Sequence, residues 1–350
     1  MLVDSPPKQS AEPISAAASR KRHAVRASGL LVSIGLLLLV CVASIAVGAK
    51  PIPLSDVWHG LFHNAGAGND VIVHDVRVPR TLLGLIVGAA LGLAGAVMQA
   101  LTRNPLAEPG LLGVNAGASA AVVSAISFLG VTSLTGYVWF AFLGAAAVSV
   151  LVYVLGGSRG ATPVRLALAG TAATAALYGY INAVQLLDAA ALERLRFWTV
   201  GSLASADMAT IGKVAPFIGV GVVLALLLAR PLNAMEMGDD TARALGAHLN
   251  RTRALAMLTV TLLCGAATAA CGPIVFIGLM IPHLVRTITG PDMRWILPYA
   301  TVLSPVLLLG ADVLGRVVTR PSELQVGVVT ALIGGPVFIH LVRRKRMAQL

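Results

Sequence analysis

About ten stretches of mostly apolar residues constrain the fold of this chain more than any other feature. Runs of about 17 to 25 residues can cross roughly 30 Å of hydrocarbon, because a helix rises ~1.5 Å per residue. We expect spans at 29–49, 82–101, 113–131, 138–156, 164–187, 211–230, 254–271, 273–288, 295–315 and 326–342. The chain is 57% hydrophobic and 12% charged, which is typical of a polytopic membrane protein. The predicted fold class is all-α.

The spans near residues 113 and 273 contain helix-interrupting residues, namely Gly113, Gly117, Gly272, Pro273 and Pro282. Broken helices at membrane depth are tolerated only where protein or a water-filled cavity satisfies the freed backbone groups. We therefore expect some of the helices to be broken.

The first 27 residues are rich in Ala, Ser and Pro and end in a basic group just before the first span. That span is too long for the apolar core of an ordinary signal peptide. We expect a disordered cytoplasmic tail over 1–27, a single transmembrane domain over 28–346, and a short tail over 347–350.

The net charge of +11 reflects topology rather than a nucleic-acid footprint. With ten spans and an inner N-terminus, most of the 26 Lys and Arg residues fall on the inner side. The positive-inside rule then puts both termini in the cytoplasm, and the protein is predicted to be a multi-pass protein of the cytoplasmic (inner) cell membrane.

The three cysteines do not indicate a redox or metal site. Cys264 and Cys271 are seven residues apart on one predicted helix, about 10.5 Å along its axis, which exceeds the ~7 Å Cα limit for a disulfide. With Cys41, they are interpreted as small buried hydrophobes. No metal site and no cofactor bound by this subunit are predicted.

A compact polar insert, MGDDTARALGAHLNRTR at 237–253, interrupts the apolar pattern. Burying the six charges of 235–253 in lipid would cost on the order of 18 kcal/mol, so the segment must lie outside the bilayer. Asp239 or Asp240 can cap or complement a first helical turn, and Gly246 supplies a left-handed stop before a second helix. Alone, this pattern fits a structured loop and a partner-docking surface equally well.

Longer motifs settle the choice by resemblance. RVPRTLLGLIVGAALGLAGAVMQALTRNPLAEPGLLGVNAGA (77–118), GPIVFIGLMIPHLVRTITGPD (272–292) and ELQVGVVTALIGGPVF (323–338) resemble the FecCD permeases. These are the membrane subunits of ATP-driven importers for ferric siderophores, haem and cobalamin. The resemblance covers about 30–346 and implies the ABC type II importer fold. It also implies a second permease, identical or paralogous, two cytoplasmic ATPases, and an extracytoplasmic substrate-binding protein.

In this family the coupling helices that contact the ATPase lie between the sixth and seventh spans, where the polar insert falls. The implied ATPase-coupling residues are Ala242, Arg243, Ala244, Leu245, Gly246, Ala247, His248 and Leu249. The chain has no phosphate-binding G-x-x-x-x-G-K-[ST] motif, because Gly212-Lys213 is followed by Val. It is therefore predicted not to be an enzyme, and ATP and Mg are expected on the partner ATPase.

On the outer side, the resemblance implies that Arg77, Arg80 and Arg316 receive acidic residues of the binding protein. The residues alone favour another interpretation, in which Arg77 and Arg80 are interface anchors and Arg316 pairs with Asp312 at i,i+4.

Few polar residues lie within the predicted spans. We expect Gln99, Asn104 and Asn115 to form hydrogen bonds between helices, as Asn and Gln commonly do in membrane bundles. Asn182 and Gln185 are the preferred candidates for the translocation pathway, because the family places it partly on the fifth and tenth helices. His283 is interpreted as a structural hydrogen-bonding residue rather than an iron ligand. The family usually has Pro where this chain has Gln325, so the resemblance does not define the backbone geometry at the start of the tenth span.

The predicted function is translocation of an iron-siderophore complex from a binding protein into the cytoplasm. The alternatives are an ion-coupled secondary transporter, or the same permease fold carrying haem or cobalamin. A secondary transporter would more often place paired ionisable residues at the bilayer midplane, whereas most charges here fall in the loops.

Overall fold

The computed structural model describes residues 16–62, 68–131, 133–157 and 163–347, and these residues form helices and no strand. The α-helices are α1 (Ala16–Ala46), α2 (Leu54–Phe62), α3 (Asn69–Val71), α4 (Val78–Thr102), α5 (Val114–Leu129), α6 (Leu134–Gly157), α7 (Pro163–Leu187), α8 (Ala189–Trp198), α9 (Met208–Leu227), α10 (Ala229–Glu236), α11 (Asp239–Ala244), α12 (Leu249–Cys271), α13 (Ile277–Thr289), α14 (Met293–Val318) and α15 (Val326–Met347). A π-helical turn, Ile72–Arg77, precedes α4, and a 3-10 turn, Pro109–Leu112, precedes α5.

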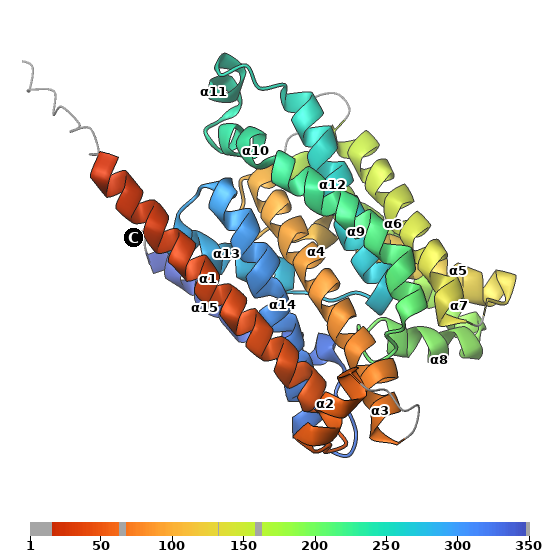
Figure 1. Cartoon of the computed structure of the whole chain (residues 1–350). Coiled ribbons are helices and arrows are strands. Elements are labelled where there is room, and N and C mark those ends of the chain that lie inside the picture. The colour runs from red at the N-terminus through yellow and green to blue at the C-terminus, as the bar shows by residue number, and fades with distance from the viewer. Residues whose placement is uncertain (1–15, 63–67, 132, 158–162, 348–350) are drawn as a thin grey trace, which may run out of the picture.

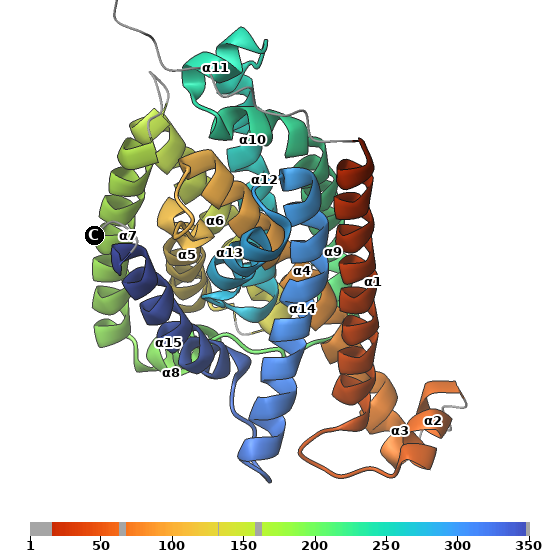
Figure 2. The same cartoon turned by 90° about the vertical axis from the view of Figure 1, so that its left-hand side faces the viewer.

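The helices form one bundle with two distinct ends (Figure 1 and Figure 2). The short helices α10 and α11 cap one end, and α2, α3 and α8 lie at the other. Among the described residues, seven helices are long and apolar enough to cross a membrane, and three shorter apolar helices accompany them. Each overlaps one predicted span, so the all-α, roughly ten-helix prediction is confirmed.

The predicted disordered tail is wrong for residues 16–27, because α1 begins at Ala16. Ala, Lys and Arg are strong helix formers, so the basic group continues the helix of the first span. Arg26 also packs on α14: its guanidinium lies 6.0 Å from the Trp295 ring centroid, and its carbonyl accepts a 2.6 Å bond from the Tyr299 hydroxyl. Residues 1–15 and 348–350 of the predicted tails lie outside the described residues.

α4 lies at the centre of the bundle, in contact with α9, α12, α13 and α14. Small residues allow this close approach, as is common between membrane helices. A Cβ at Gly88 would lie 2.6 Å from the Pro305 backbone of α14, and one at Gly95 would overlap the Gly278 carbonyl of α13. The glycine stripe therefore serves helix packing.

Two of the predicted helix breaks occur where expected. Gly113 and Gly272 have φ of 73° and 75°, and Phe276 follows with φ of 71°. The helices after them, α5 and α13, have 16 and 13 residues, about 24 and 20 Å. Both are shorter than the hydrocarbon thickness, so their N-terminal ends begin inside the bundle.

Gly117 and Pro282 were predicted to interrupt helices, and that prediction is wrong. Gly117 lies within α5, where its missing side chain allows close contact with the Gly144 carbonyl of α6. Pro282 lies within α13 and cannot donate to the carbonyl four residues earlier. That carbonyl, of Gly278, instead accepts a 3.3 Å hydrogen bond from Gln99 of α4, so the helix continues.

Replacing Gly95 by Ala should destabilise the bundle by about 1–3 kcal/mol, because the added methyl overlaps backbone that cannot rotate away. The thermal unfolding midpoint of the detergent-solubilised protein would measure the effect. Gly35→Ala is the matched control, since nothing lies within 4 Å of a Cβ there. Equal midpoints for the two variants would contradict this account of α4.

Candidate functional site

The polar insert forms a helical elbow, defined here as residues 229–249, at one end of the bundle (Figure 1). It consists of α10, a turn at Gly238 with φ of 105°, α11, and a second turn at Gly246 with φ of 79°. The predicted order of helix, left-handed stop at Gly246 and next helix is confirmed. Neither Asp239 nor Asp240 caps α11 through its side chain; both lie in its first turn, where they complement the helix dipole.

Ion pairs hold the elbow to the bundle. Asp239 accepts hydrogen bonds from Arg103, at the end of α4, and from Arg253, at the start of α12, the latter at 2.7 Å. Partial burial raises the pKa of Asp239, but the hydrogen bonds from Arg253 and Arg103 outweigh it, so the pKa lies below its usual value. The carboxylate therefore stays charged at neutral pH. A pair between Glu236 and Arg286, at 2.7 Å, ties α10 to α13.

The predicted coupling residues divide into anchors and displayed groups. Ala242 and Leu249 are buried and fix the elbow, and Ala247 is half-buried. The displayed residues are Arg243, Ala244, Leu245, Gly246 and His248. Leu245 is 63% exposed, so its apolar side chain is available for contact with a partner.

At the opposite end of the bundle, the three arginines predicted to dock a binding protein are buried rather than displayed. Arg80 bonds Asp312 at 2.7 Å and Glu323 at 2.6 Å. Arg316 pairs with Asp312 at 2.9 Å, which confirms the expected i,i+4 pair. Arg77 donates to three backbone carbonyls, those of Ile45, Ala46 and Lys50.

These arginines are therefore not exposed cationic side chains. Asp312 lies between two guanidinium groups at the junction of α4 and α14, and each of the three arginines is less than 5% exposed. Sequence spacing revealed the pair within α14 but not the partner of Arg80, which lies 232 residues away. Their role in docking stays a prediction.

Interior polar side chains form hydrogen bonds to backbone groups near the helix breaks and between helices. Glu108 accepts a 3.0 Å hydrogen bond from the Phe276 amide, just before α13. Gln99 donates to the Leu279 carbonyl at 3.0 Å, and Asn115 of α5 accepts from Thr268 of α12 at 3.0 Å. The prediction that such residues bridge helices is confirmed for Gln99 and Asn115.

Two polar side chains differ from the sequence expectations. Asn104 accepts instead from the nearby Leu106 amide at 3.0 Å, so it shapes a local turn. Glu108 was not identified from the sequence. Its position as a lone acidic residue within the motif TRNPLAEPGLLG could have indicated a partly buried, hydrogen-bonded carboxylate.

The two predicted pathway residues lie on α7, at the edge of the bundle (Figure 2). Asn182 is exposed and Gln185 is half-buried, beside the strongly exposed Leu186 and Leu187. Neither residue lines the cavity beside α8 or the grooves at the elbow. His283 is half-buried on α13, and no group of three metal-ligating side chains occurs within the described ranges.

Comparison with known proteins decides the family. The model of the FecCD transport family matches residues 36–344. The chain belongs to the FecCD transport family. It is 48% identical to the ferric enterobactin transport system permease protein FepD of Escherichia coli (strain K12), over 89% of this chain and 94% of that protein.

Other relatives of this FecCD protein are named for the transport of different substrates. It is 38% identical to the Fe(3+)-citrate import system permease protein YfmD of Bacillus subtilis (strain 168), covering 94% of this chain and 98% of that one. It is 36% identical to the hemin transport system permease protein HmuU of Yersinia pestis, covering 89% and 94%. A solved metal-chelate type ABC transporter in an inward-facing conformation matches 91% of this chain and 99% of its own, with TM-score 0.79 and 26% identity.

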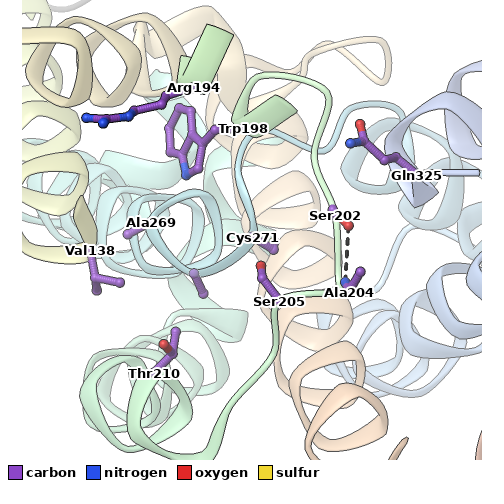
Figure 3. A pocket seen from close by; sticks show the side chains of 11 residues that line it. Val138, Arg194, Trp198, Ser202, Ala204, Ser205, Thr210, Ala269, Cys271 and Gln325 are labelled. Carbon is purple, nitrogen blue, oxygen red and sulfur yellow. Dashed lines mark hydrogen bonds between the residues drawn. The ribbon is translucent and has the colours of Figure 1, made fainter. Parts of the chain in front are cut away.

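The FecCD protein is thus a multi-pass membrane permease of an ABC importer. At the end opposite the elbow it has a cavity of 220 Å³ (Figure 3). Arg194 and Trp198 reach it from α8, and Gln325 reaches it from the residue before α15. Gln325 is therefore one of the polar residues that line the cavity.

Replacing Asp312 by Asn should destabilise this FecCD protein by about 3–5 kcal/mol, because two buried guanidinium groups lose their shared counter-charge. Glu323→Gln is the control: its side chain is 35% exposed and contacts only Arg80 of the three arginines, so its cost should be well below that of Asp312→Asn. Thermal unfolding of the purified variants measures both. A larger loss for Glu323→Gln would overturn the central position given to Asp312.

Proposed function

We propose that this FecCD permease carries a ferric siderophore from a substrate-binding protein into the cytoplasm, driven by two ATPase subunits on the elbow side. The observation that carries the coupling step is the elbow itself, a rigid segment clamped by Asp239 and displaying Leu245. The proposed cargo rests on the names of the relatives, most of which refer to ferric siderophores or ferric citrate. The chain itself would bind no nucleotide, and ATP and Mg would reside on the ATPases.

The coupling mechanism follows from the way in which the elbow is attached. Displayed residues 243–246 would seat in a cleft of the ATPase, so that nucleotide-driven closure pushes on α11. Because Asp239 is paired with both α4 and α12, the push would move those helices as one body. The elbow would face the cytoplasm, with both chain termini on the same side, as the positive-inside rule predicts.

Docking of the binding protein is proposed at the opposite end. Arg80 and Arg316 lie just below that surface, and Glu323 is the partly exposed member of their network. Acidic residues of a binding protein would compete with Glu323 and Asp312 for the guanidinium groups. A second permease, identical or paralogous, would cover the face of α7 that carries the exposed Asn182 and the half-buried Gln185.

Replacing Leu245 by Asp should abolish ATP-driven uptake while the complex still assembles, because a charge replaces the apolar contact with the ATPase. Uptake and ATP hydrolysis in proteoliposomes, with copurification of the ATPase, measure the effect. Val25→Asp is the control, since Val25 is 64% exposed but lies on α1. Full transport by Leu245→Asp with normal ATPase association would contradict the coupling role.

Reconstituted vesicles should accumulate radiolabelled iron from ferric enterobactin only when ATP, the ATPase and the binding protein are all present. Uptake driven by an ion gradient without ATP would instead support a secondary transporter. Haemin and cobalamin are the competing cargoes. Preferential uptake of either one over several ferric siderophores, with the same ATP dependence, would refute the proposed cargo and leave the importer function intact.

A further inference from the structure

A groove of 670 Å³ lies where the elbow meets the membrane-spanning part of the bundle. Its lining comes from the end of α9, the start of α10, the turn at Gly246 and the start of α12. The residues that matter here are Leu224, Leu227, Arg230, His248, Arg251 and Leu255. The groove therefore combines apolar and cationic groups and has no acidic residue in its lining.

The two arginines of the groove differ from the others at this end of the bundle. Arg103 and Arg253 pair with Asp239, Arg243 pairs with Asp240, and Arg286 pairs with Glu236. Within the described part of the chain, Arg230 and Arg251 make no ion pair, and both are exposed. Because the neighbouring acidic residues pair with other arginines, Arg230 and Arg251 can attract an anion from outside the chain.

The apolar part of the groove continues along the outside of the bundle. On α9, Val220, Val223 and Leu227 recur at helical spacing and are 54%, 56% and 70% exposed. On α12, Arg251 is followed by Leu255 and then by Leu258, which is 47% exposed. Because these positions are three or four apart, each set shares one helix face.

α9 and α12 pack against each other, so the two faces form an apolar track that begins at the arginines. Such a track suits acyl chains, which make apolar contacts along it. A soluble anion would make no such contacts.

We propose that this groove binds an anionic glycerophospholipid of the elbow-side leaflet, with its phosphate between Arg230 and Arg251 and its acyl chains along α9 and α12. Basic pockets between membrane helices are suited to anionic head groups, and each arginine near the surface adds to the attraction. The proposal requires only that the chain spans a membrane, so it is independent of the cargo. The groove also borders Leu245 and Gly246 of the proposed coupling surface, so the test includes the ATPase as a competing occupant.

The test is lipid retention by the purified, delipidated full-length protein, measured by native mass spectrometry. The probes are phosphatidylglycerol and phosphatidylcholine with identical acyl chains. The wild type should retain phosphatidylglycerol preferentially, and R230Q/R251Q should lose that preference by about tenfold. R230K/R251K should keep most of it, which separates charge from packing. The charge-matched control is R194Q/R196Q, which alters exposed arginines on α8 at the other end and should leave the preference unchanged.

Three further arms distinguish other occupants. L227S, a change at a 70% exposed position, should weaken retention of both lipids if acyl chains follow the track. Displacement of phosphatidylglycerol by millimolar inorganic phosphate would overturn the proposal in favour of a simple anion site. Loss of the lipid when the ATPase subunits bind would overturn it in favour of an ATPase seat. Equal retention by wild type and R230Q/R251Q would also overturn it.

Discussion

The requirement to satisfy backbone polar groups away from water governs this bundle. α5 and α13 begin inside the protein, and their free amides and carbonyls have no solvent to bond. Glu108 meets the amide of Phe276, and Gln99 meets the carbonyl that Pro282 leaves without its helical partner. Each of these two side chains lies in or just after α4, so one helix and its following loop stabilise the broken segment from a single side.

The two ends of the bundle use ion pairs differently. At the elbow, Asp239 bonds two arginines while staying partly exposed, so the segment is fixed yet accessible to a partner. At the opposite end, Asp312 is fully buried between Arg80 and Arg316. A buried pair of this kind contributes little net stability, but removing one partner is costly, so it fixes the geometry of the helices that it joins.

Local patterns made much of this predictable from sequence. Hydrophobic runs predicted the spans, Gly246 predicted the stop in the elbow, and i,i+4 spacing predicted the pair of Arg316 with Asp312. The failures involve long-range contacts. Glu108 bonds a residue 168 positions away and Arg80 one 232 positions away, and no periodicity links such residues. The helix α8 was also missed, because its ten residues are amphipathic and too short to register as a span.

The position of α4 links the two ends into one mechanical unit. Arg80 lies in its first turn and bonds Asp312 of α14, while Arg103 follows its last turn and bonds Asp239 of the elbow. The helix of 25 residues is about 37 Å long, and its glycine stripe packs it tightly against its neighbours. Closely packed interiors have low compressibility and transmit strain. A force applied to the elbow by an ATPase would therefore reach the arginine network beneath the proposed docking surface, and binding at that surface would reach the elbow by the same helix.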